Sequence, residues 1–388
     1  MKITEIRETT ISLRSPIRNA WIDFSEMTTS LVVVKSDVIR DGKPLCGFGF
    51  NSNGRYAVGS IIRDRLAPRL TAANPDDLLD DTRSAFDPVK CHEVMMRNEK
   101  PGGHGDRSVA CGAIDMALYD LTAKVLDVPL WKYLSDRFST NSANRKVFVY
   151  AAGGYYVPGK SLQDLQDEMR SYRALGYQHV KMKIGGADLA EDLRRIEAVL
   201  EVTGDGKYLL VDANGRLSTD AAIAYAKALQ PYNLFWYEEP CDPLDYFAHS
   251  EVTKHYKNPM ATGENLFSAQ EGINLLRYAG MRPDRDFIQI DPALAGGLSE
   301  YLKFLQQMPN FGWSAERCIP HGGHQFTLHI AAALGLYGNE SYPGIFEPIG
   351  GFADGVEVID GYVELSDAVG IGIENKKALM DEYRKLVD

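Results

Sequence analysis

The chain lacks any apolar run that approaches the ~20 residues of a membrane-spanning helix. Its first segment, MKITEIRETTISL, alternates polar and apolar residues and has no apolar core of the kind found in signal peptides. These absences argue against a membrane protein and against a secreted one. We therefore expect a cytoplasmic protein with no membrane partner.

Cysteine is scarce and follows no pairing pattern. The chain has five cysteines, an odd number, and none of them stands in a CxxC pair. This pattern argues against a disulfide framework and is typical of reduced, mostly buried thiols in a cytoplasmic protein. The cysteines are Cys46, Cys91, Cys111, Cys241 and Cys318.

Positive charge is in deficit. The chain has 42 Lys and Arg against 53 Asp and Glu, which gives a net charge of −11. An acidic chain of this kind is a poor partner for nucleic acid. A small anionic substrate would need a local cationic pocket to overcome the repulsion.

What is present is an ordinary globular composition, 45% hydrophobic and 24% charged, in a chain of 388 residues, long enough for two domains. In the first ~140 residues, strands at 2–13 and 28–37 precede a glycine-rich stretch at 47–59. Helical patterns then cover 63–73, 76–86 and 112–134, the last stopping near Pro129. We expect residues 1–140 to form an N-terminal α+β capping domain.

From about residue 146, apolar strands alternate with amphipathic helices, which predicts a parallel sheet covered on both faces. Seven such units in sequence favour a closed barrel over residues 141–345. The glycine-rich residues 346–388 lose the pattern and are expected to return to the capping domain. The predicted strands are 147–154, 179–186, 208–215, 234–240, 258–265, 287–294 and 317–323.

Three carboxylates, Asp212, Glu238 and Glu264, follow three successive predicted strands at equal intervals of 26 residues. This is about the length of one strand, one helix and two loops, so the acids should meet at the mouth of the barrel. Converging carboxylate oxygens bind hard divalent cations, and Mg²⁺ is the predicted cofactor. Taken alone, Asp212 in DANG would fit a turn equally well, and Glu239 competes with Glu238 as the ligand.

The neighbouring strand ends carry basic and acidic groups. Lys181 and Lys183 share the inward face of one predicted strand, Asp291 ends another, and His321 follows the last. His324 of the same HGGH run competes with His321. Lys183 can remove a proton next to a metal-bound carboxylate if Lys181 and the metal lower its pKa. Asp291 can orient and charge His321 as an acid.

Together these motifs resemble the enolase superfamily, specifically its mandelate racemase subgroup. The resemblance implies a modified TIM barrel, (β/α)7β, under an α+β capping domain built from both chain ends. It also implies that the first Glu of EEP, Glu238, binds the metal. The matching motifs are Lys181-x-Lys183, DAN with Asp212, EEP with Glu238, GEN with Glu264, DPALAGG with Asp291, and His321.

Within the subgroup, the chain most closely resembles the D-tartrate dehydratase family, through KMKIGG, the YY pair after the first barrel strand, NEKPGG and NESYPG. Asn51 stands in the same loop as Asn53 and is an alternative to it. Lys100 has a rationale of its own, because a cation could neutralise the second carboxylate of a diacid. The substrate contacts that the resemblance implies are Asn19, Asn53, Lys100, Tyr155, Lys181 and Glu340.

The expected reaction is Mg²⁺-dependent dehydration of a 2,3-dihydroxy acid, D-tartrate to oxaloacetate, in a homo-oligomer. Alternatives are a dehydratase of another aldonic or aldaric acid, or a racemase with the same acid–base pair. A non-catalytic protein would have lost these residues. A hydrolase of the amidohydrolase type would carry a His-x-His pair on its first barrel strand, and VFVYAAGG has none.

Overall fold

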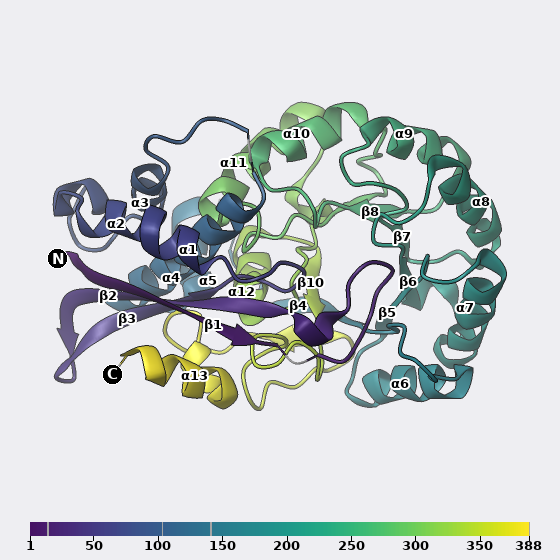
Figure 1. The fold of residues 1–388 in the computed structure, drawn as a ribbon, viewed down its shortest axis with the longest axis horizontal. Coiled ribbons are helices and arrows are strands. Elements are labelled where there is room, and N and C mark those ends of the chain that lie inside the picture. Colours follow the sequence, from purple (N-terminus) through teal and green to yellow (C-terminus); the bar gives the residue numbers. More distant parts are fainter. Residues whose placement is uncertain (14, 103, 140–141, 388) are drawn as a thin grey trace.

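The computed structural model describes the chain except residues 14, 103, 140, 141 and 388. An antiparallel sheet with its helices lies beside a curled parallel sheet ringed by helices (Figure 1). This confirms the predicted α/β class, a modified barrel with an antiparallel cap. Among the described residues, none of the helices combines the length and the apolar character that crossing a membrane requires.

The N-terminal sheet has the order β1-β2-β3, and both strand pairs are antiparallel. Helix α4 packs so closely on β3 that a Cβ added at Gly47 would lie 1.9 Å from the carbonyl oxygen of Ala117. Glycine at this position therefore fixes the distance between sheet and helix. The bounds are β1 Ile3–Ser12, β2 Thr28–Arg40, β3 Lys43–Phe50, α1 Gly59–Ile61, α2 Ala67–Thr71, α3 Pro88–Met95, α4 Asp106–Val125 and α5 Leu130–Phe138.

Three details in this part differ from the sequence-based expectations. β3 covers the start of the glycine-rich stretch, which was not predicted as a strand. The helix predicted at 76–86 is wrong beyond a single 3-10 turn, because the Asp80 side chain accepts backbone hydrogen bonds from Ser84 and Ala85 and holds a turn. The helical pattern at 112–134 belongs to two helices, since Asp127 has a positive φ and Pro129 precedes α5.

The parallel sheet follows the order β10-β4-β5-β6-β7-β8-β9. The remaining gap is filled by the segment 318–321, which hydrogen-bonds to β9 on one side and accepts from the Tyr337 amide on the other. The sheet thereby closes on itself. The strands are β4 Lys146–Ala152, β5 His179–Lys183, β6 Leu209–Asp212, β7 Trp236–Glu238, β8 Met260–Thr262, β9 Phe287–Ile288 and β10 Gly338–Ser341.

A ring of helices covers the outside of this sheet (Figure 1). Several begin at a residue whose side chain caps the first turn, such as Ser161, Asp188 and Ser218. These caps start each helix soon after its strand, so the strand ends stay at one mouth. The helices are α6 Leu162–Ala174, α7 Leu189–Thr203, α8 Thr219–Leu229, α9 Tyr246–His255, α10 Ala269–Tyr278, α11 Leu298–Gln307 and α12 Gln325–Leu334.

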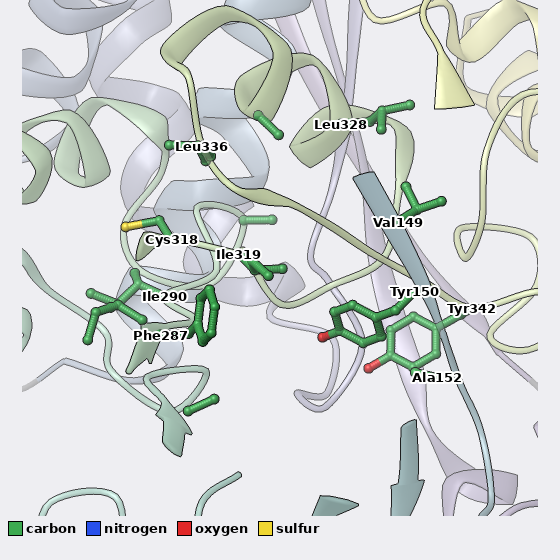
Figure 2. Close-up of a cluster of buried hydrophobic side chains, with 14 of the residues drawn as sticks. Val149, Tyr150, Ala152, Phe287, Ile290, Cys318, Ile319, Leu328, Leu336 and Tyr342 are labelled. Atoms are coloured by element: carbon green, nitrogen blue, oxygen red, sulfur yellow. The ribbon is translucent and has the colours of Figure 1, made fainter. Parts of the chain in front are cut away.

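Part of the hydrophobic core lies where the sheet closes, between β4, the region of β9 and the segment 318–319. Figure 2 shows buried side chains of β4, of the β9 region and of the 318–319 segment in one cluster, with Tyr150, Phe287 and Ile319 among them. Burial of these groups on both faces stabilises the short strands, which have few ladder hydrogen bonds of their own.

The C-terminal segment touches both parts of the chain. Its strand β11 (Tyr362–Glu364) pairs antiparallel with β4, and its helix α13 (Lys377–Val387) lies against the N-terminal sheet (Figure 1). The Tyr383 hydroxyl donates to the Gly49 carbonyl at 2.6 Å, and Arg7 donates to the Leu386 carbonyl at 2.7 Å. These contacts tie the end of the chain to its beginning.

Candidate active site

The ends of β5, β6 and β7 bring three charged groups into line. Lys183 pairs in register with Asp212, and Asp212 pairs with Glu238. Alternate residues of a strand face the same side, so Lys181 also points into the barrel. All four side chains are buried. The parallel ladder therefore sets the spacing of these groups.

The predicted carboxylate cluster forms. One oxygen each from Asp212, Glu238 and Glu264 lies within 4.8 Å of the others, at the mouth of the sheet. Glu264 follows β8 by two residues and is the least buried of the three. This spacing suits a divalent ion that keeps open positions for a substrate.

The electrostatics of the cluster favour a cation. Burial and the negative charge of Asp212 raise the pKa of Glu238 to about 8. Glu264 Oε2 is buried and has no hydrogen-bond partner among the described residues. An orphaned buried carboxylate oxygen is costly, and a metal ligand bond satisfies it. The donor set of hard oxygens fits Mg²⁺.

Glu239, the alternative to Glu238, faces another partner. Both of its carboxylate oxygens accept from Asn265 Nδ2, at 2.9 and 2.8 Å. Its φ of 40° lies in the left-handed region, which turns the chain between the two glutamates. Glu238 instead accepts from Trp236 Nε1 at 2.8 Å and points to the cluster. The geometry therefore places Glu238 with the metal group.

Lys183 lies at the floor of the site. Its ammonium donates to Asp212 Oδ2 and lies 5.2 Å from the centre of the Tyr155 ring. Burial and the charge of Lys181 lower its pKa, but the Asp212 carboxylate raises it further, and the pKa stands above its usual value. From the sequence, a lowered pKa is expected for Lys183, but in the protein chain alone the direct contact with Asp212 outweighs the lowering effects.

Lys181 and Glu340 form a buried ion pair instead of lining the cavity. The Lys181 ammonium lies 2.7 Å from Glu340 Oε1 and 2.7 Å from Glu238 Oε1. Both carboxylates raise the pKa of Lys181 well above its usual value, although burial opposes this. The Gly322 amide donates to the other Glu340 oxygen at 3.1 Å. In this arrangement Lys181 holds Glu238, and the predicted substrate contacts of Lys181 and Glu340 stay predictions.

His321 pairs with Asp291 as the sequence suggested. Its Nδ1 lies 2.9 Å from Asp291 Oδ2, and its Nε2 lies 3.8 Å from Glu264 Oε2. Burial lowers the pKa of His321, but Glu264, Asp291 and Glu340 raise it, and the result is about 9. His324 is different, because burial lowers its pKa to about 4 and its side chain caps α12.

These groups open into a cavity of about 410 Å³ between the barrel mouth and the N-terminal loops. Lys183, Glu264 and His321 form part of its wall. A larger cavity of about 550 Å³, beside the C-terminal segment, has none of the three metal-cluster residues in its lining. The smaller cavity is therefore the candidate active site.

Three of the predicted substrate contacts, Asn19, Asn53 and Tyr155, line the smaller cavity. Asn51, the alternative to Asn53, does not, because its amide is engaged by backbone groups. Its Oδ1 accepts from the Ser30 amide at 2.6 Å, and its Nδ2 donates to the Arg55 carbonyl at 3.0 Å. Asn51 therefore shapes the loop, and Asn53 faces the cavity.

Lys100 lies elsewhere. Its side chain is exposed, it is not part of the cavity wall, and Arg107 donates to its carbonyl at 3.1 Å. As placed, Lys100 does not reach the site described above. Its role as a substrate contact stays a prediction.

Sequence reasoning also missed other residues of the cavity wall, among them Asn214, Asn265, Arg55 and Trp21. Asn214 and Asn265 stand in the DAN and GEN motifs with the predicted metal ligands Asp212 and Glu264, so position in the motif was an available signal. Arg55 follows Asn53 by two residues in a loop that was interpreted only as glycine-rich. Trp21 gave no signal, since its indole reaches the Asn214 carbonyl, 193 residues away, at 2.9 Å.

Comparison with known families places this geometry in context. Residues 164–379 match the family described as "Enolase C-terminal domain-like". Residues 3–135 match the family described as "Mandelate racemase / muconate lactonizing enzyme, N-terminal domain". The two matches together contain every strand of the N-terminal sheet and every acid and base of the site.

Individual relatives include dehydratases. The chain is 30% identical to L-talarate/galactarate dehydratase of Salmonella typhimurium, over 89% of this chain and 81% of the relative. It is 31% identical to 3,6-anhydro-alpha-L-galactonate cycloisomerase of Streptomyces coelicolor, over 93% and 92%. The Salmonella typhimurium LT2 dehydratase also has a solved structure with Mg and L-lyxarohydroxamate, with TM-score 0.75, 26% identity and coverage of 95% and 88%. Mg²⁺ in that structure agrees with the ion predicted here.

Proposed function

Because the chain belongs to the enolase superfamily, in the mandelate racemase and muconate lactonizing enzyme group, we propose that it dehydrates a hydroxy acid with Mg²⁺. The finer proposal is that the substrate is D-tartrate and the product oxaloacetate. The observation that carries the reaction type is the placement of Lys183 and His321 in one cavity wall, with the carboxylate cluster between the strands that hold them.

The cluster of Asp212, Glu238 and Glu264 would hold the metal. Mg²⁺ bound there would neutralise Asp212 beside Lys183 and, next to a substrate carboxylate, would stabilise the charge that develops when the α-proton leaves. Lys181 supports the cluster from below, because its ammonium holds Glu238 in place.

Lys183 is proposed as the base. It removes the proton from the carbon next to the carboxylate, and its side chain is held by Asp212 and the Tyr155 ring. The electron pair of that C–H bond first delocalises onto the neighbouring carboxylate, and in a second step it forms the C=C bond of the enol product as the C–O bond of the β-hydroxyl breaks.

His321 is proposed as the acid. Its raised pKa keeps the imidazolium protonated near neutral pH, and Asp291 fixes the ring through Nδ1, which leaves Nε2 to deliver the proton. The β-hydroxyl then departs as water, and the enol product tautomerises to a 2-keto acid. Base and acid on different sides of the substrate predict anti elimination.

Asn19, Asn53 and Tyr155 are proposed to contact the hydroxyl groups of the substrate, since all three line the cavity. The Asn19 Oδ1 atom accepts from the Trp21 and Ile22 amides, so its Nδ2 is the group available to a ligand. Tartrate as the substrate is supported by the resemblance of the motifs KMKIGG, NEKPGG and NESYPG to the D-tartrate dehydratase family.

A dehydratase of a longer acid sugar is the second candidate, because relatives of the chain carry such names, L-talarate/galactarate dehydratase among them. A panel with Mg²⁺ separates the two: the three tartrate stereoisomers, galactarate, glucarate, gluconate and arabinonate, with 2-keto acid as the readout. We expect the highest kcat/KM with D-tartrate. Turnover of a longer acid with none from any tartrate would overturn the finer proposal, and no 2-keto acid from any of them would overturn the reaction.

A further inference from the structure

Arg55 is the one arginine in the cavity wall formed by the described residues. It lies in the loop after β3, two residues beyond Asn53, and its side chain is partly buried. The protein has a net charge of −11, and three carboxylates already stand at the barrel mouth. The other basic residues of this wall, Lys183 and His321, have proposed roles in the reaction, whereas Arg55 has none.

The guanidinium is held rigidly by neutral groups. Its Nη1 donates to the Gly54 carbonyl at 2.6 Å, its Nη2 donates to Asn265 Oδ1, and its carbon lies 4.9 Å from the centre of the Phe267 ring. Asn265 and Phe267 line the same cavity. A planar fork fixed in this way has already lost the rotamer freedom that ligand binding would otherwise cost.

No carboxylate of the described residues forms an ion pair with Arg55. The contacts described above are to a carbonyl, an amide oxygen and an aromatic ring, so the guanidinium has no carboxylate partner among the described residues. A fixed, unpaired guanidinium at a cavity wall is a ready partner for a carboxylate, which it can bind through two hydrogen bonds.

The position of Arg55 relative to the metal group suits the far end of a short acid. Asn265, which accepts from Arg55, also has its Nδ2 3.5 Å from Glu264 Oε1. One side-chain amide thus separates the guanidinium from a predicted metal ligand. An acid whose first carboxylate lies at the cluster would place a second carboxylate, a few bonds away, within reach of Arg55.

We infer that Arg55, held by Asn265, binds the second carboxylate of the substrate and so sets a preference for dicarboxylic acids over monocarboxylic ones. The inference rests on the proposed function, because it assumes that the first carboxylate lies at the metal cluster. It assigns to Arg55 the task that the sequence suggested for Lys100.

The alternative role of Arg55 is purely structural. Through Asn265 it reaches Glu239, and a loss of this contact could disturb the neighbouring Glu264. That role predicts weaker Mg²⁺ binding and equal losses for every substrate. A specificity role predicts a loss confined to diacids.

The test compares Arg55→Gln, which retains a donor for Asn265 but removes the charge, with the wild type. The substrates are tartrate and its monoamide, which share a carbon skeleton and both hydroxyl groups. For tartrate, we expect kcat/KM to fall about 10–100-fold, mainly through KM, because a charge-assisted contact is lost. For the monoamide, we expect a change of less than about threefold, since its amide gains little from a cation.

Arg216→Gln is the matched control. Arg216 is an exposed arginine outside the cavity wall, and its guanidinium carbon lies 4.2 Å from the centre of the Trp21 ring. Its replacement by Gln removes the same charge near the same mouth of the barrel. It should leave the ratio of tartrate to monoamide rates unchanged. An equal fall of both rates in Arg55→Gln, with weakened Mg²⁺ binding, would overturn the inference.

Two measurements keep the test independent of folding and of turnover. Arg55→Lys retains the charge without the fork and should recover part of the tartrate preference. In calorimetry with the Mg²⁺-loaded wild type, malate should bind at least about tenfold more tightly than the malate monoamide in which the distal carboxylate is replaced by an amide. Equal affinities would refute the assignment of Arg55 even if the protein dehydrates neither acid, which separates this failure from failure of the proposed function.

Discussion

Replacement of Asp291 by Asn should shift the pH dependence of turnover without removing His321. In the wild type the pKa of His321 stands at about 9, above the ordinary value of 6.5. A proton donor works only while it is protonated, so kcat should fall as the pH rises through that pKa. Mg²⁺ bound to Glu264 would partly neutralise that carboxylate and so weaken its effect on His321. The fall of kcat at alkaline pH, the alkaline limb of the pH profile, should therefore have an apparent pKa between 6.5 and about 9 in the Mg²⁺-loaded enzyme.

The size of the pKa change expected in Asp291→Asn follows from one buried contact. A hydrogen bond between charged partners, such as the 2.9 Å contact of His321 with Asp291, contributes about 1.5–3 kcal/mol. Asn keeps the shape but not the charge, so the pKa of His321 should drop by roughly one to two units, since one unit is about 1.4 kcal/mol. The alkaline limb of kcat should move down by the same amount.

The assay is the formation of 2-keto acid at saturating substrate and Mg²⁺, measured across pH for the wild type and Asp291→Asn. His324→Gln serves as the control, because His324 is a neutral histidine outside the cavity wall. Its alkaline limb should stay in place. A limb that does not move in Asp291→Asn would refute the role of Asp291 in charging His321.

Three further predictions follow from the same site. Lys183→Ala should lower kcat by about 10²–10⁴-fold while Mg²⁺ binding, followed by calorimetry, persists, and a rate near wild type would remove Lys183 as the base. Removal of the metal with a chelator should abolish turnover and lower the melting temperature, since saturating Mg²⁺ at 100 times its dissociation constant adds about 2.7 kcal/mol; an unchanged melting curve would argue against the carboxylate site. Lys181→Met should destabilise the fold by about 3–5 kcal/mol in denaturant titrations, because Glu238 and Glu340 lose their buried cation; a variant as stable as the wild type would show that this pair is not needed.

The barrel could be predicted because its sequence pattern is local. Strands buried on both faces read as continuous apolar runs, and each is followed by an amphipathic helix with its own cap. The equal spacing of Asp212, Glu238 and Glu264 then fixed their common mouth. The segment 317–323 shows the limit, because it joins the barrel through a few backbone hydrogen bonds and the bridge at Cys318 instead of a full strand.

The roles of charged side chains were harder to predict, because they depend on partners far along the chain. The family resemblance implies that Lys181 contacts the substrate, yet in the structure Lys181 forms a buried ion pair with Glu340, which lies 159 positions later on β10. Arg55 looks like a loop residue until Asn265 and Phe267 are seen around it. Pattern reasoning finds which residues reach a mouth, and only the packed structure shows which of them face the cavity.

The assignment of Lys183 as the base and His321 as the acid is tested most directly by proton exchange in deuterated water. In His321→Asn, loss of the β-hydroxyl is blocked but Lys183 can still remove the α-proton, so substrate recovered after incubation with Mg²⁺ should carry deuterium at that carbon. In Lys183→Ala, recovered substrate should carry none. Deuterium in Lys183→Ala and none in His321→Asn would contradict the account and reverse the assignment of base and acid.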